Sequence, residues 1–114
     1  MELSKFSESE IPKLLKSARR VVKHPGLDFL IAPKAHELAR ILVITPKRVG
    51  NAPERNKVRR RIKALFYEAG LPQGLYDCIA IIKKDGAQLP YEELHKIILD
   101  GLKKYESLDQ KPAE

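Results

Sequence analysis

The stretch from Lys47 to Lys63 constrains the fold most, because it combines dense positive charge with regularly spaced apolar residues. Eight of its residues are basic and one, Glu54, is acidic, so the stretch has a net charge of +7. The rest of the 114-residue chain holds 14 basic and 14 acidic side chains and is neutral. All of the excess charge therefore belongs to one segment, which indicates a polyanionic partner.

The same stretch predicts the central helix of the domain. Pro53 suits a first helical turn, and Ala52 before it is expected to lie outside the helix. Gly70 and Pro72 are expected to end the helix after Ala69. Helical spacing then gives a core-facing stripe and an opposite face that carries Asn56, Arg60, Lys63 and Tyr67. The predicted stripe comprises Val58, Ile62, Leu65, Phe66 and Ala69.

The charges on this helix do not follow the pattern of an ordinary solvated surface. Such surfaces usually alternate in sign at i, i+4. Here Arg55 and Arg59 repeat the same sign, as do Lys57 and Arg61, and each such pair costs a few tenths of a kcal/mol. Bound phosphates would reverse this repulsion, and arginine favours bidentate phosphate contacts. The candidate binding residues are Lys47, Arg48, Arg55, Asn56, Lys57, Arg59, Arg60, Arg61 and Lys63.

The remaining periodicity predicts a single α+β domain over residues 1–114, with loose tails at about 1–9 and 106–114. Helices are expected at about residues 10–19, with Ser9 as N-cap, and 91–105. Strands are expected at residues 21–22, 27–32, 40–45 and 76–83. The longest apolar runs are too short to span a bilayer, and the N-terminus lacks the apolar stretch of a signal peptide. We therefore expect a cytoplasmic protein without a membrane partner.

Catalytic and metal-binding patterns are missing from the sequence. The three histidines and Cys78 show no metal-ligand spacing, and Cys78 is expected to pack as a small hydrophobic residue. Asp77 and Asp85 are isolated, whereas a two-metal nuclease needs a cluster of carboxylates. We therefore expect no catalytic residue in the protein itself and identify no metal ligands, and the sequence leaves open whether the protein binds a magnesium ion near the basic helix.

Residues 55–63, Arg-Asn-Lys-Val-Arg-Arg-Arg-Ile-Lys, resemble the arginine–asparagine–arginine signature of the bacterial ribonuclease P protein subunit. The signature reads Arg-Asn, any residue, an aliphatic residue, two basic residues, any residue, an aliphatic residue and a basic residue. Every constrained position matches. The segments 47–50, 76–82 and 91–94 are also similar to the corresponding family segments, so the resemblance covers about residues 15–105.

The resemblance implies an αβββαβα fold with a left-handed βαβ crossover around the basic helix. It implies that this helix binds the catalytic RNA subunit of ribonuclease P, one protein per RNA. A cleft beside the sheet would hold the 5′ leader of precursor tRNA. The RNA would catalyse hydrolysis with magnesium ions that it binds mainly itself. Physical rules alone favour a right-handed crossover.

The chain departs from the family at the leader cleft. Family members usually carry two aromatic residues on the first helix, where this chain has aliphatic residues such as Ile11 and Leu15. Leu15 and Phe29 are the candidate leader-cleft residues. Phe29 could stack on a base or be an ordinary core residue.

Three other classes of protein compete with the ribonuclease P hypothesis. A ribosomal or other structural RNA-binding protein would explain the basic helix but not the motif with its flanks. A protein-only nuclease is opposed by the missing carboxylate cluster. A helix-turn-helix DNA reader is opposed by the strand that follows the basic helix.

Overall fold

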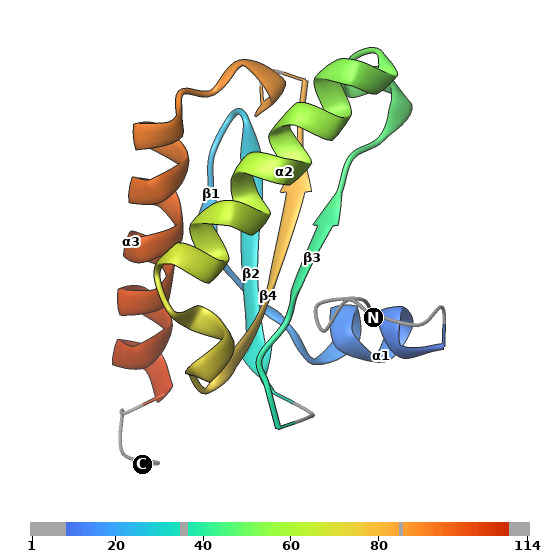
Figure 1. Cartoon of the computed structure of the whole chain (residues 1–114). Coiled ribbons are helices and arrows are strands. Elements are labelled where there is room, and N and C mark those ends of the chain that lie inside the picture. Colours follow the sequence, from blue (N-terminus) through green and yellow to red (C-terminus); the bar gives the residue numbers. More distant parts are fainter. Residues whose placement is uncertain (1–8, 35–36, 85, 110–114) are drawn as a thin grey trace.

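The computed structural model describes residues 9–34, 37–84 and 86–109, and its elements follow the predicted order αβββαβα (Figure 1). The helices are α1 (Glu10–Ser17), α2 (Ala52–Glu68) and α3 (Tyr91–Asp109). The strands are β1 (Arg19–Lys23), β2 (Leu27–Pro33), β3 (Ile41–Ile44) and β4 (Tyr76–Ile82). Single turns of 3-10 helix lie at η1 (Lys47–Val49), η2 (Leu71–Gln73) and η3 (Gly86–Gln88). The predicted α+β class is confirmed.

The four strands of the described residues form one mixed sheet in the order β1-β2-β4-β3. β2 is antiparallel to both of its neighbours, whereas β3 and β4 are parallel and are connected through α2. In Figure 1, α2 lies in front of the sheet, both of these strands run upward, and β4 lies to the left of β3. This is the left-handed crossover that the family resemblance implied, against the usual right-handed rule.

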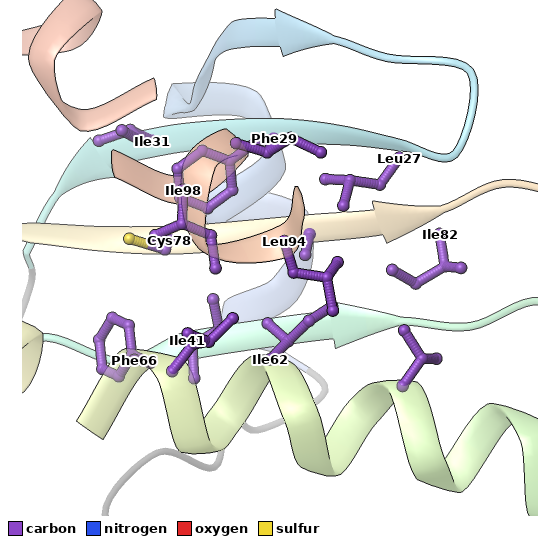
Figure 2. Close-up of a cluster of buried hydrophobic side chains, with 14 of the residues drawn as sticks. Leu27, Phe29, Ile31, Ile41, Ile62, Phe66, Cys78, Ile82, Leu94 and Ile98 are labelled. Carbon is purple, nitrogen blue, oxygen red and sulfur yellow. The ribbon is translucent and has the colours of Figure 1, made fainter. Parts of the chain in front are cut away.

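Strand alternation divides the sheet into two apolar faces. On one face, Leu27, Phe29 and Ile31 of β2 join the main core with α2 and α3 (Figure 2). On the other face, Leu14 of α1 packs with Ala32 and with residues of β4. The structure therefore places the basic helix and the short first helix on opposite sides of one sheet.

Phe29 lies at the centre of the main core and has no exposed surface. A Cβ atom placed on Gly101 of α3 would lie 2.5 Å from Phe29 Cδ2, so the helix backbone passes directly over the ring. No nucleic-acid base can reach it. The interpretation of Phe29 as a leader-cleft residue is wrong, because odd-numbered positions of β2 face α3 and even-numbered positions face α1.

The predicted ends of the two outer helices also need correction. α1 stops at Ser17, because Ala18 is extended and Arg19, the first residue of β1, already pairs with Ile31 of β2. Ser9 precedes α1, but its side chain makes no capping hydrogen bond. α3 continues to residue 109, past the predicted end at Tyr105, whose ring packs 4.9 Å from that of Tyr76. The rest of both predicted tails lies outside the described residues.

The close approach of Gly101 to Phe29 gives a prediction about stability. In an exposed helix, Gly→Ala normally stabilises by about 0.5–1 kcal/mol. At Gly101 the added methyl group would overlap Phe29, and we expect Gly101→Ala to destabilise by about 1–3 kcal/mol. Urea unfolding measures the change. An unchanged or higher midpoint would contradict the packing described here.

Candidate nucleic-acid interface

A capping box sets the start of α2. The side chain of Asn51 accepts a hydrogen bond from the backbone N–H of Glu54 (2.9 Å), and the backbone N–H of Asn51 donates to Glu54 Oε1 (3.1 Å). The helix therefore begins at Ala52, one residue earlier than predicted, with Pro53 in its first turn. The Asn-x-x-Glu spacing was present in the sequence as a capping signal. The only acid of the basic segment thus serves the helix start.

The other end of α2 follows the predicted signals. Gly70 adopts φ +71°, a left-handed conformation that favours glycine after a helix. Ala69 is the C-cap and is exposed, so its predicted place in the apolar stripe is wrong.

The apolar stripe of α2 fixes the rotation of the helix on the sheet. Val58, Ile62, Leu65 and Phe66 are each at most 2% exposed. Figure 2 shows Ile62 and Phe66 directed from α2 toward the sheet, next to Ile41 of β3. The sequence prediction is confirmed for these four residues. Their burial determines which charged side chains point outward.

The outward face of α2 presents Asn56, Lys57 and Arg60, which are all exposed. Lys47 and Arg48, in the η1 turn before the helix, are exposed as well. The hydrogen bonds and ion pairs of the described residues give Lys57, Arg60, Lys47 and Arg48 no acidic partner. These four side chains are therefore available to bind an anion.

Two arginines on the flanks of α2 are held by the protein. Arg59 donates to Thr45 Oγ1 at the end of β3 and to Asn56 Oδ1 (3.2 Å). Arg61 donates to the carbonyl of Leu89 after η3 (3.4 Å). The two guanidinium groups therefore lean toward opposite sides of α2. Asn56 acts at least partly as an acceptor that orients Arg59, a role the sequence did not indicate.

Arg55 differs from the other cations of the segment. It precedes Ile62 by seven residues, close to two helical turns, so both side chains leave α2 on the sheet-facing side. Arg55 is partly buried, and its Nε atom is fully buried without a hydrogen-bond partner among the described residues. Arg55 therefore lies at the edge of the exposed cationic surface and does not point outward as Lys57 and Arg60 do.

On the opposite face of the sheet, α1 is anchored by one buried residue and one ion pair. Leu14 packs on the sheet, and the guanidinium of Arg40 binds the carboxylate of Glu10 through two contacts of 2.7 and 3.4 Å. Asp77, which is buried, accepts the backbone N–H of Arg40 (2.8 Å). A pocket of about 200 Å³ lies between α1 and the sheet. Its lining is Glu10, Lys13, Leu14, Ser17, Pro33, Arg40 and Asp77.

The predicted cleft residue Leu15 is 37% exposed. At 100° per residue it lies on the opposite side of Leu14 from Lys13 and Ser17, so it is not part of the pocket. Leu15 lies on the same side of α1 as Ile11, which packs against the apolar cluster between α1 and the sheet. Leu15 therefore lies exposed at the edge of α1, beside the part of the sheet face that α1 does not cover.

The part of this sheet face that no described element covers has an aliphatic floor and a charged end. Leu30, Leu42, Ile44 and Ile81 are partly exposed there. At the end remote from α1, Asp28 forms ion pairs with Lys83 (2.7 Å) and Arg20 (3.4 Å). Sequence reasoning missed this group, although strand alternation places Asp28 on the same face as Leu30.

Cys78 is completely buried in the main core, as predicted. Burial, reinforced by the neighbouring charge of Asp77, raises the pKa of its thiol far above the ordinary value, so it is no nucleophile. Among the described residues, no three His, Cys, Asp or Glu side chains gather as they would around a metal ion. No described helix is long and apolar enough to cross a membrane.

The left-handed α+β fold and the exposed cations of α2 define a small basic protein whose charged helix face suits a polyanionic ligand. Residues 6–106 match the model of the family described as Ribonuclease P, and the chain belongs to that family. The family provides the protein component of an endoribonuclease of tRNA processing, which implies an RNA partner.

Individual relatives agree with this assignment. The chain is 31% identical over 78 residues to the ribonuclease P protein component of Dehalococcoides mccartyi; the alignment spans 68% of this chain and 64% of that protein, just under two thirds. It is 27% identical over 107 residues to the component of Bacillus pumilus, spanning 92% of this chain and 89% of that one.

Solved structures of two further proteins share the fold. The RNase P protein of Staphylococcus aureus superposes with a TM-score of 0.73 at 18% identity, over 90% of this chain and 94% of that chain. The RNase P protein of Thermotoga maritima gives a TM-score of 0.68 at 17% identity, over 82% and 89%. At these identities the likeness shows the fold alone.

Proposed function

We propose that this chain is the subunit that assists a catalytic RNA in removing the 5′ leader from precursor tRNA, in the cytoplasm and with one protein per RNA. The observation that carries the proposal is the exposed row of cations on α2. The chain is neutral outside residues 47–63, and within them Lys57 and Arg60 point outward without an acidic partner among the described residues. Such a row suits the phosphates of a folded RNA.

The role of the protein would be positioning rather than chemistry. Two RNAs that come together repel each other through their phosphates, and a cationic protein between them lowers that cost. The described residues offer no carboxylate cluster that fits a magnesium ion. We therefore assign the magnesium ions and the hydrolysis they support to the RNA subunit, and derive no step through the protein.

The partly uncovered sheet face is the best surface for the leader. Its floor of Leu30, Leu42, Ile44 and Ile81 can contact bases without reading their edges. Arg20 and Lys83 at its charged end can contact phosphates. Because Phe29 is buried and α1 lacks aromatic residues, base stacking on this face would be weak, and the leader would be held mainly by aliphatic contact and charge.

Reconstitution at low magnesium tests the proposal. Precursor tRNA is incubated with nuclease-free protein, with ribonuclease P RNA from the same genome, and with both. We expect no cleavage by the protein alone and faster cleavage with both than with RNA alone. A structural RNA-binding protein would bind RNA without accelerating cleavage, and that result, or cleavage by protein alone, would contradict the proposal.

Arg60 gives the cleanest test of the binding surface. Arg60→Ala removes an exposed cation that lies three residues from both Lys57 and Lys63, so we expect a slightly higher thermal midpoint. Affinity for the RNA should fall about ten-fold, because a charge-assisted contact is lost. Filter binding and thermal unfolding provide the two measurements.

Lys103→Ala on α3 is the matched control, because it removes the same charge from another exposed helix position. It should leave affinity nearly unchanged. If about six cations of the wild-type protein contact phosphate, log affinity should fall with log salt at a slope of roughly −4 to −5. Equal loss from both variants, or a flat salt dependence, would mean that α2 is not the binding surface.

A further inference from the structure

We propose that Tyr67, near the C-terminal end of α2, stacks on an unpaired base of the bound RNA. This inference rests on the proposed function and adds a contact of a different chemical kind to the cationic row. The surface of α2 would then have two parts: the cations would contact phosphates, and Tyr67 would contact a base.

The first argument is the position of Tyr67 on the helix. Tyr67 is 47% exposed and follows Arg60 by seven residues and Lys63 by four, so all three side chains lie on one side of α2. Ala64, one helical turn before Tyr67, and Gly70, just beyond the end of the helix, are both exposed and small. A flat ligand can therefore approach the Tyr67 ring from the side of Ala64 and Gly70 without displacing a large side chain.

The second argument is the change of charge along α2. The last turn of the helix has no basic residue and contains Glu68. The free carbonyl groups at a helix C-terminus add partial negative charge, which disfavours a phosphate there. An RNA strand that follows the cations toward this end therefore loses its charge contacts at Tyr67. An aromatic ring can still bind the base, since stacking requires no positive charge.

The third argument concerns what Tyr67 does within the protein. Its ring meets that of Phe66 edge to face, with centroids 5.9 Å apart and planes at 86°. Phe66 is completely buried and is held by the main core. This contact fixes the Tyr67 ring from one side and leaves about half of the side chain in solvent. A ring that is anchored but exposed loses little freedom when it binds.

A tryptophan substitution tests the inference directly, because the chain contains no tryptophan. Tyr67→Trp supplies a single tryptophan, whose emission is quenched by a stacked base. The probes are ribonuclease P RNA and heparin, a polyanion without bases. We expect RNA to quench the emission and heparin to bind without quenching. Lys103→Trp, at an exposed position of α3, is the control and should not be quenched.

Affinities of two further variants complete the test. Tyr67→Ala should weaken RNA binding roughly 5- to 100-fold without changing the salt slope, whereas Tyr67→Phe should bind normally. Normal RNA binding by every variant, without quenching at position 67, would overturn the inference and leave the proposed function standing. Wild-type protein that binds the RNA no better than an unrelated RNA would overturn both.

Discussion

The packing of the apolar stripe of α2 against the sheet is the constraint on which the binding surface depends. Val58, Ile62 and Leu65 fix the rotation of the helix, and a slip by one residue would turn every side chain by about 100°. Burial of each such side chain contributes about 1.5–3 kcal/mol, so the stripe outweighs the roughly 1–2 kcal/mol of repulsion among the neighbouring cations. The fold can therefore hold Lys57 and Arg60 outward although no acidic side chain among the described residues pairs with them.

The cations of this segment differ in what the protein does with them. Arg59 and Arg61 are tied to β3 and to the loop after η3, so their directions are set before any RNA arrives. Lys57 and Arg60 are free to adjust to phosphate positions. Glu54, which could have neutralised one of them, is engaged in the capping box with Asn51. The segment thus keeps its full charge and still has a well-defined helix start.

Local signals predicted most of this fold. The helical spacing of Val58, Ile62 and Leu65 predicted which face of α2 is buried, and Gly70 predicted where the helix ends. The hand of the crossover followed only from the family motif, because handedness depends on how distant strands meet. Phe29 was misassigned for a related reason. Strand alternation shows that Phe29 shares a face with Leu27 and Ile31, but it does not show which helix covers that face. The ion pair of Glu10 with Arg40 joins residues thirty positions apart, and no local pattern marks such a pair.

A site-directed crosslink tests most directly the claim that RNA lies along the outward face of α2. Cys78 is buried, so a photo-crosslinker can be attached selectively to a new thiol at Ala64→Cys, exposed between Arg60 and Tyr67. His95→Cys, exposed on α3, is the control. The account predicts efficient crosslinks to ribonuclease P RNA from position 64 and few from position 95. Equal yields from both positions, or a higher yield from position 95, would contradict it.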